Sequence, residues 1–304
     1  MENRRTPAEN AQLALLLEVA GTPKPGNVDR DRDMPDLRFE HFLAGAVGAG
    51  RGLRLAEGGE SVGRSFERAV AGMALQEGGN TQFGALLLIV PLVRAAADGT
   101  DEPSAATPSL EESDEASSPG VVVEAPTPEA VTRIVESTTI EDAAAFYRAF
   151  EHVDVFVEDP PEGVPDVREG ADATDAVESG EMNLYEVIAA GAERDDVARE
   201  WTSGFERSFD AADRIEARNG PLSARAAAVY LELLSERPDT LVAKRRGERT
   251  AQRVMTRAQA AREDGPELID AFAERLIEEG INPGTTADVV AAGLFIALCR
   301  SAEV

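Results

Sequence analysis

The chain has 304 residues, of which 30 are lysine or arginine and 57 are aspartate or glutamate, so its formal net charge is −27. A field of this sign repels nucleic acid and anionic membranes, and we exclude both as partners. Apolar residues make up 43% of the chain, aromatic residues only 5%, and alanine is abundant. This composition predicts a globular protein built from helices rather than sheets.

Extreme acidity combined with only two lysines is typical of proteins that work in high salt. The Debye length falls to about 3 Å at 1 M salt, so the repulsion within an acidic surface is screened there. We therefore expect a halophilic protein with an acidic surface. The longest apolar run, Ala85 to Val93, contains Pro91 and is too short to cross a bilayer. With no signal peptide visible, we expect a cytoplasmic location.

Helical periodicity follows the chain from residue 8 onward. It predicts helices at about 8–20, 38–56, 62–77, 82–97, 129–152, 182–218, 222–236, 248–262, 266–279 and 285–302. Two segments interrupt the pattern. Residues 99–128 are rich in Ser, Pro, Ala, Asp and Glu without any basic residue, and we interpret them as a disordered acidic insertion. Residues 158–180 look similar and predict a surface loop. The fold class is therefore all-α: one multi-helix bundle domain spanning 1–304, with acidic surface insertions.

The two lysines, Lys24 and Lys244, mark two of the four segments that could carry chemistry. A lysine is a compact ammonium, which suits a site that faces phosphate oxygens. Lys24 opens a loop that contains Asp29, Asp31 and Asp33. Three carboxylates at a period of two could hold a hard cation such as Mg²⁺. The alternative is a solvated charge run in an acidic protein.

Lys244 belongs to Pro238–Gly247, the densest basic patch of the chain, which also holds Asp239 and Arg245. Within a chain of charge −27, this patch is the best candidate for a polyphosphate clamp. It could equally neutralise the C-terminal end of a helix.

The other two segments are turns that precede apolar helices. Asn80 and Thr81 precede the run that starts at Ala85, so they could bind an anion at a helix N-terminus, cap the helix, or do both. Asp288 follows a Pro-Gly turn in the first turn of the last helix. It either complements the helix dipole or faces inward toward a metal ion or hydroxyl group.

Taken together, the four segments resemble the triphosphoribosyl-dephospho-CoA synthase family. They match a PKPGxVD segment at Pro23–Asp29, a Gly-x-Asn-Thr-x-x-Gly turn at Gly78–Gly84, an Asp-Thr-x-x-x-(Arg/Lys)-(Lys/Arg)-x-Gly segment at Asp239–Gly247 and a Pro-Gly-x-x-Ala-Asp segment at Pro283–Asp288. Order and spacing agree from about residue 8 to 302, apart from the acidic insertions. Each motif alone is weak, but four in order are specific.

The resemblance implies an all-helical transferase for ATP and 3′-dephospho-CoA. Such an enzyme joins the triphosphoribosyl group of ATP to the ribose 2′-hydroxyl of the acceptor and releases adenine. We expect the family's roles to fall on residues of the four segments, and Asp195 also resembles a family position. The expected roles are substrate and phosphate binding by Lys24, Asn80, Thr81, Asp239, Lys244 and Arg245, catalysis by Asp29 and Asp33, and Mg²⁺ binding by Asp33 and Asp288.

The loop after the first motif departs from the family pattern. Bacterial members carry a Gly-Ala-His-x-Asp-Met segment there, whereas this shorter loop keeps only its end, Arg32–Met34, and has no histidine before Asp33. The acceptor therefore stays open at this point. One alternative is a homologue that transfers a ribosyl-phosphate group to another acceptor in cofactor synthesis. Another is a non-catalytic nucleotide-binding protein.

Overall fold

The computed structural model describes residues 5–98, 125–300 and 302–304. All the secondary-structure elements within these ranges are helices, which confirms the all-α fold class. The elements are α1 (Pro7–Ala20), α2 (Phe39–Glu57), α3 (Val62–Met73), α4 (Phe83–Asp98), α5 (Pro128–Glu136), α6 (Ile140–Ala149), the 3₁₀ turn η1 (Val167–Glu169), α7 (Ala171–Glu178), α8 (Leu184–Ala189), α9 (Asp196–Thr202), α10 (Glu206–Glu216), α11 (Leu222–Glu236), α12 (Thr240–Arg246), α13 (Glu248–Asp264), α14 (Pro266–Glu278) and α15 (Gly284–Cys299).

Helices are more numerous than the periodicity suggested, because capping residues divide two of the predicted long helices. Thr139 and Asp142 form a capping box at the start of α6, so the predicted helix 129–152 is divided into two helices, α5 and α6. Asp195 accepts hydrogen bonds at the start of α9 and divides the region 182–218. The basic segment near Lys244 also forms a helix of its own, α12, which the periodicity did not indicate.

The two predicted acidic insertions have different outcomes. The segment 99–128 lies almost wholly outside the described residues, and α5 begins at Pro128. The segment 158–180 starts as irregular chain, as expected of a loop, but its second part forms η1 and α7. Burial of Ala173 and Val177 against the rest of the protein explains why this part is helical.

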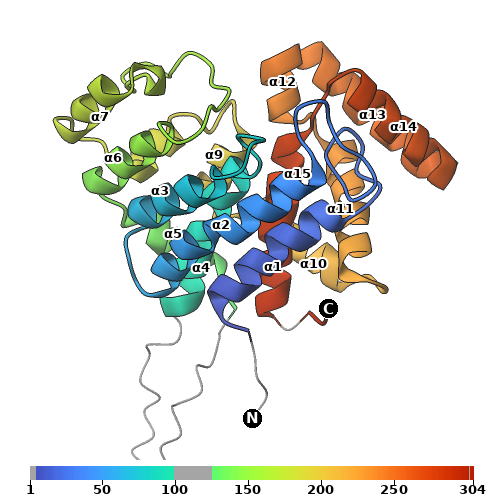
Figure 1. The fold of residues 1–304 in the computed structure, drawn as a ribbon, viewed down its shortest axis with the longest axis horizontal. Helices are drawn as coiled ribbons and strands as arrows, with labels where there is room; N and C mark the ends of the chain where they lie inside the picture. Colours follow the sequence, from blue (N-terminus) through green and yellow to red (C-terminus); the bar gives the residue numbers. More distant parts are fainter. Residues whose placement is uncertain (1–4, 99–124, 301) are drawn as a thin grey trace, which may run out of the picture.

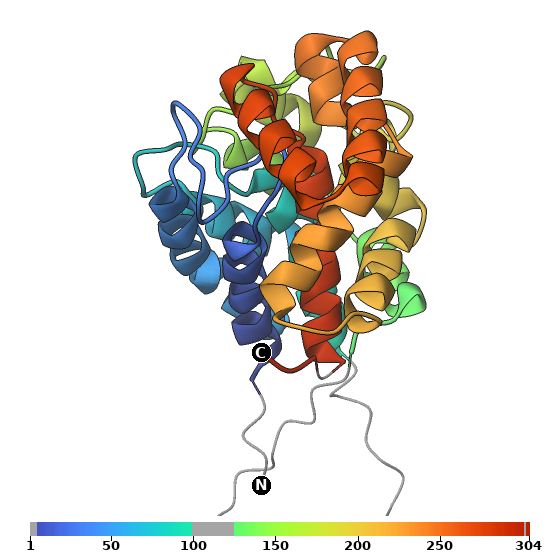
Figure 2. The ribbon, with the colours of Figure 1, turned by 90° about the vertical axis from the view of Figure 1, so that its right-hand side faces the viewer.

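Helices α4 and α15 form the centre of the molecule. Almost every residue of α15 is buried, and so are twelve residues of α4, which is the pattern of a helix surrounded by others. Figures 1 and 2 show α1 beside α15. Four helices pack against α15: α1, α4, α10 and α11. The expectation that Cys299 belongs to the core is confirmed, since it is buried at the end of α15.

Glycines in α2 permit a close contact between α2 and α3. A Cβ atom on Gly48 would lie 2.1 Å from the carbonyl oxygen of Gly72 in α3, and one on Gly52 would lie 2.3 Å from the backbone nitrogen of Ala69. Any larger residue would force the two helices apart. These glycines therefore serve helix packing.

None of the helices in the described ranges combines the length and the apolar character that crossing a bilayer requires.

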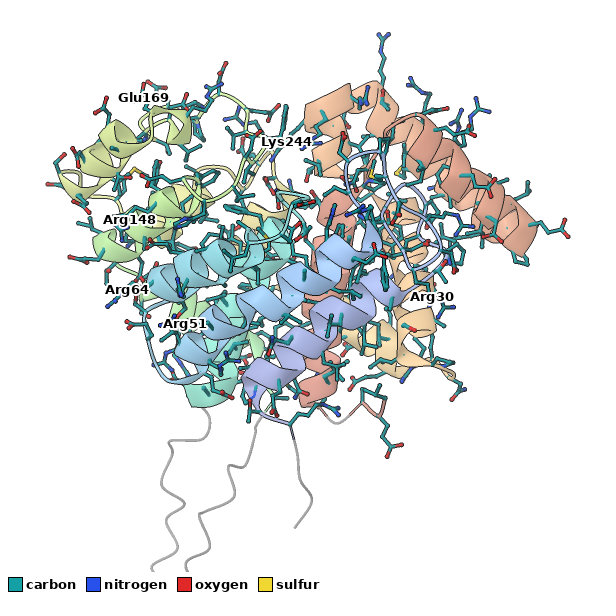
Figure 3. All side chains as sticks on the ribbon, in the orientation of Figure 1. Arg30, Arg51, Arg64, Arg148, Glu169 and Lys244 are labelled. Carbon is teal, nitrogen blue, oxygen red and sulfur yellow. The ribbon has the colours of Figure 1, made fainter. Side chains whose placement is uncertain are left out.

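Arginines at the surface are solvated, as Figure 3 shows for Arg30, Arg51 and Arg64. Because the net charge is −27, repulsion between surface carboxylates should dominate the salt dependence of stability. We expect the Tm to rise steadily between 0.1 and 2 M KCl, since salt screens this repulsion. Thermal unfolding followed by circular dichroism at 222 nm measures the effect, with sucrose of matched osmolality as the control. A Tm that stays constant or falls over this range contradicts the halophilic interpretation.

Candidate active site

Three adjoining cavities lie where the four sequence motifs meet. The aromatic cavity, about 290 Å³ in volume, lies between the N-terminal end of α4, α6, the irregular segment 155–167 and the α8–α9 turn. The central cavity, about 100 Å³, is bordered by α1, α4 and α15. The basic cavity, about 300 Å³, lies between the 34–37 loop and α12. Asn80, Phe83, Gly84, Leu241 and Asp288 line both the aromatic and the central cavity. Leu37, Leu241, Arg245 and Asn282 line both the central and the basic cavity.

Lys24 is one of the most deeply buried side chains, with 1% of its surface exposed. Its ammonium forms an ion pair with Glu18 of α1 and donates to Asn27 Oδ1 at 2.9 Å. Burial raises the pKa of Glu18, and the charge of Lys24 opposes this shift. Both Glu18 and Asn27 line the central cavity. The structure thus places Lys24 behind two cavity-lining residues.

Asp29 and Asp33, the two carboxylates expected in catalysis, have partners in their own loop. Asp29 is fully buried and accepts hydrogen bonds from the Lys24 backbone nitrogen at 3.0 Å, from Thr22 Oγ1 at 3.1 Å and from the Asp31 backbone nitrogen at 2.9 Å. Asp33 is exposed and accepts from the Phe39 nitrogen at the start of α2, at 2.8 Å. Neither carboxylate borders any of the three cavities.

Asp288, by contrast, lies on the wall shared by the aromatic and central cavities. A Cβ atom on Gly84 would lie only 2.1 Å from Asp288 Oδ2, so the glycine of the second motif leaves space for this carboxylate. Burial raises the pKa of Asp288 well above its usual value, and the negative charges of Glu18, Asp239 and Asp195 raise it further. A hydrogen bond from the Ala85 backbone opposes the shift.

The second motif brings further polar atoms to this place. Asn80 Oδ1 accepts from the Phe83 nitrogen at 3.1 Å, which confirms the capping interpretation for this residue. Thr81 Oγ1 and Gln82 Oε1 are buried without a hydrogen-bond partner among the described residues. Both residues line the central cavity. Unpaired buried oxygens are costly, and a ligand or water molecule in this cavity would satisfy them.

The third motif divides its polar residues between structure and cavity. Asp239 is buried and accepts from Val242 N at 3.1 Å and from both the backbone nitrogen and Oγ1 of Thr286 at 2.8 Å. It therefore joins the start of α12 to the start of α15 and borders none of the three cavities. Lys244 forms an ion pair with Asp195 on the wall of the aromatic cavity. Figure 3 shows Lys244 on the side of α12 that faces the helices α6 and α9.

Arg245 connects all three cavities. It lines the central and basic cavities, and its guanidinium lies 5.2 Å from the ring centroid of Phe156, which lines the aromatic cavity. Arg245 forms no ion pair with a carboxylate among the described residues, so its charge is available to a bound anion.

Mg²⁺ was expected at Asp33 and Asp288. No group of three His, Cys, Asp or Glu side chains within the described ranges is arranged to hold a metal ion. Mg²⁺ often binds to one or two carboxylates plus substrate phosphates, however, and needs only a small set of oxygen ligands. The central cavity offers such oxygens from Glu18, Asp288, Asn27 and Asn282. The donor set there fits a cation that arrives with phosphate.

Sequence reasoning missed Glu18, Asn27, Asn282 and Gln82. Glu18 looked like an ordinary acidic residue near the end of α1. The signal that could have revealed it is Lys24 itself, because a buried ammonium requires a nearby carboxylate. Asn27 and Asn282 are within hydrogen-bond distance, with Asn27 Nδ2 donating to Asn282 Oδ1 at 2.9 Å. Each is part of a recognised motif or adjacent to one, but their pairing across 255 positions was not visible in the sequence.

Comparison with known proteins assigns the chain to a family. The family described as ATP:dephospho-CoA triphosphoribosyl transferase matches residues 4–304. The chain belongs to this family. No curated protein matches the chain in sequence.

A crystal structure from Archaeoglobus fulgidus, of a protein provisionally named triphosphoribosyl-dephospho-CoA synthase, is similar to this chain. The two share 26% sequence identity and superpose with a TM-score of 0.66, over 88% of this chain and 100% of the other. Membership of the triphosphoribosyl transferase family makes the chain a transferase, with ATP and dephospho-CoA as the substrates that the family implies.

Asp288, which is partly buried on a cavity wall, and Asp239, which is buried between α12 and α15, provide a test of their different positions. The raised pKa of Asp288 means that ionising this carboxyl group costs more free energy in the folded protein than in the unfolded chain. Its contribution to stability is therefore present at low pH and lost as the pH rises through the raised pKa. We expect Asp288→Asn to raise the Tm at pH 8, by about 2–4 °C for each kcal/mol relieved. The gain over the native protein should shrink as the pH falls toward 5.

Asp239→Asn is the matched variant. Although burial also raises the pKa of Asp239, its Oδ2 accepts two hydrogen bonds from Thr286, and an amide nitrogen in that place cannot accept them. We expect this variant to lower the Tm at pH 8. Thermal unfolding of both variants at pH 5 and pH 8 measures the difference. A loss of stability in Asp288→Asn similar to that in Asp239→Asn contradicts the proposed distinction.

Proposed function

We propose that the chain transfers the triphosphoribosyl group of ATP to the ribose 2′-hydroxyl of 3′-dephospho-CoA and releases adenine. Family membership supports the choice of substrates. The observation that supports the reaction is the position of Asp288, a partly buried carboxylate between an apolar, aromatic cavity and a second cavity bordered by Arg245. ATP has this same order of groups, with a flat base, a ribose and a charged triphosphate.

The transfer exchanges one bond at C1 of the ribose for another. The bond from C1 to the adenine nitrogen breaks, and its electron pair leaves with adenine. The oxygen of the acceptor hydroxyl forms the new bond to C1. The hydroxyl loses a proton and adenine gains one, so the reaction does not change the total charge. As in other glycosyl transfers, positive charge develops on the ribose ring in between, and a nearby carboxylate stabilises it.

Asp288 is the carboxylate that we assign to this task. It borders both cavities, so a ribose that joins a base in one to a triphosphate in the other would pass beside it. The ionised carboxylate would stabilise the ring charge and accept the proton of the acceptor hydroxyl. The raised pKa of Asp288 makes it a stronger base than an ordinary aspartate.

Arg245 is the main phosphate ligand in this proposal. Its exposed guanidinium borders the central and basic cavities, and Arg246 borders the basic cavity beside it. Guanidinium groups bind phosphate oxygens in a bidentate manner. Lys24 would act on the phosphates through Glu18 and Asn27 rather than by contact, because it lies behind both. Asn80 and Thr81 would contact the nucleotide at the central cavity.

Glu18 and Asn282 are the residues that would hold Mg²⁺ in the central cavity, together with the phosphates. The ion, when bound, would neutralise part of the triphosphate charge. Burial raises the pKa of Glu18, and the paired ammonium of Lys24 opposes this shift by favouring the ionised carboxylate, the form that would bind the cation.

A different acceptor is the second candidate, and the 34–37 loop favours it. Met34, Pro35, Asp36 and Leu37 form part of the wall of the basic cavity. They belong to the loop that is shorter than in the bacterial members of the family. A change of length here alters the space around the phosphates, and with it the room for the acceptor.

Adenine release from ATP tests the function. The protein would be incubated with ATP and Mg²⁺ in high KCl, with and without 3′-dephospho-CoA, and the products separated by chromatography. We expect free adenine only when dephospho-CoA is present, together with a product that contains both groups. Adenine release that does not depend on dephospho-CoA indicates another acceptor or water. A folded protein that releases none in either mixture contradicts the proposal.

Asp288→Asn and Asp33→Asn form a matched pair for the catalytic assignment. We expect Asp288→Asn to lower the rate of adenine release by about 10²–10⁴-fold, the usual loss on removing an acid–base group. Asp33→Asn should stay within about threefold of the native rate, because the amide oxygen can still accept from Phe39 and the residue borders none of the cavities. Loss of activity in Asp33→Asn with an active Asp288→Asn reverses the assignment.

A further inference from the structure

The aromatic cavity contains a feature that the four motifs do not explain. Its lining is mostly apolar and includes four phenylalanines and several aliphatic side chains: Phe83, Phe146, Phe150, Phe156, Val187, Ile188 and Ala198. With a volume of about 290 Å³, it is close to the lower end of the range for small-molecule sites, roughly 300–1,000 Å³. The cavity is therefore suited to one compact, flat group.

Three of these phenylalanines, Phe83, Phe146 and Phe150, are in mutual ring contact. The ring centroids of Phe83 and Phe150 are 4.9 Å apart, and those of Phe146 and Phe150 are 5.2 Å apart. Phe156 is 43% exposed, which is unusual for a phenylalanine next to a cavity. Flat heteroaromatic bases stack on such side chains.

The lining of the cavity also contains an ion pair, Asp195 and Lys244. Their side chains are only 30% and 19% exposed, and both line the cavity. Asp195 Oδ1 is used at the start of α9, where it accepts from the nitrogens of Val197 at 2.8 Å and Ala198 at 3.3 Å. The other oxygen, Oδ2, pairs with Lys244. The pair therefore offers a hydrogen-bond acceptor and a donor side by side, at the edge of an aromatic slot.

We propose that the aromatic cavity binds the 6-aminopurine ring, with Asp195 accepting from the exocyclic amino group and Lys244 donating to the neighbouring ring nitrogen. Adenine presents this combination of donor and acceptor along one edge, and a carboxylate next to an ammonium is complementary to it. Hypoxanthine bound in the same orientation places an oxygen, in the position of the amino group, against the Asp195 carboxylate, which repels it. The site thus selects adenine nucleotides over inosine nucleotides.

This assignment rests on the proposed function and adds the position of the leaving group to it. It also separates the two basic residues of α12. Lys244 faces the base, whereas Arg245 faces the triphosphate, and the contact of Arg245 with Phe156 connects the two parts. With adenine in the aromatic cavity and phosphates near Arg245, the ribose lies beside Asp288.

Binding of free ligands tests the site without turnover. Isothermal titration would measure adenine, hypoxanthine, pantetheine and inorganic tripolyphosphate against the native protein, Asp195→Asn and Arg245→Ala. Asn keeps the oxygen that caps α9 but presents an amide NH₂ to the base in place of Oδ2. For the native protein we expect adenine to bind at least tenfold more tightly than hypoxanthine. Loss of a hydrogen bond to a charged group costs about 10–100-fold, so Asp195→Asn should remove this preference or reverse it.

Arg245→Ala is the control, because it should weaken tripolyphosphate binding and leave the preference for adenine over hypoxanthine unchanged. Circular dichroism confirms that each variant is folded. A preference for adenine that survives in Asp195→Asn overturns the proposal, as does an equal loss of both purines. Tight binding of pantetheine that is competitive with adenine assigns the cavity to the acceptor instead and also overturns it.

Failure of this inference is distinguishable from failure of the function. If the native protein releases adenine from ATP but Asp195→Asn discriminates between the purines as the native protein does, the reaction stands and the base site is elsewhere. If adenine binds with the predicted selectivity but no adenine is released, the site stands and the proposed reaction fails.

Discussion

The buried ion pair of Lys24 and Glu18 is the constraint on which the site depends. A charge removed from water costs several kcal/mol unless an opposite charge and hydrogen bonds compensate it, and either partner alone would be strongly destabilising. Lys24 also donates to Asn27, which in turn donates to Asn282 just before α15. The pair thus fixes the loop after α1 against the start of α15, although the two segments lie near opposite ends of the sequence.

Other contacts of this loop reinforce the same arrangement. The hydroxyl of Tyr230 in α11 donates to the carbonyl oxygen of Pro25 at 2.8 Å. Asp29 holds the turn from within, and Asp239 joins α12 to α15 through Thr286. These buried carboxylates act as framework. Asp288, by contrast, lies on a cavity wall, where burial raises its pKa.

Sequence reasoning identified the four segments that border the cavities, and the roles that it assigned within them stay predictions. The rarity of lysine directed attention to Lys24 and Lys244, and both lie at the site, although Lys24 is behind it. The capping role of Asn80 was also predictable, because local spacing determines it, and the position of Asp288 on a cavity wall agrees with one of the two alternatives that the sequence offered. Roles that depend on distant partners were not. Asp29 and Asp33 look like metal ligands in a one-dimensional pattern, yet their hydrogen bonds are to their own loop and to the start of α2. The all-α fold was predictable since helical periodicity is local, whereas the helix breaks at Thr139 and Asp195 depended on single capping residues.

A crystal structure of the protein with ATP and Mg²⁺, in the absence of an acceptor, tests the central claim most directly. The account predicts the adenine ring among the phenylalanines of the aromatic cavity, the ribose beside Asp288 and the triphosphate against Arg245. A triphosphate bound in the aromatic cavity, or a ribose remote from Asp288 and close to Asp33, would contradict it.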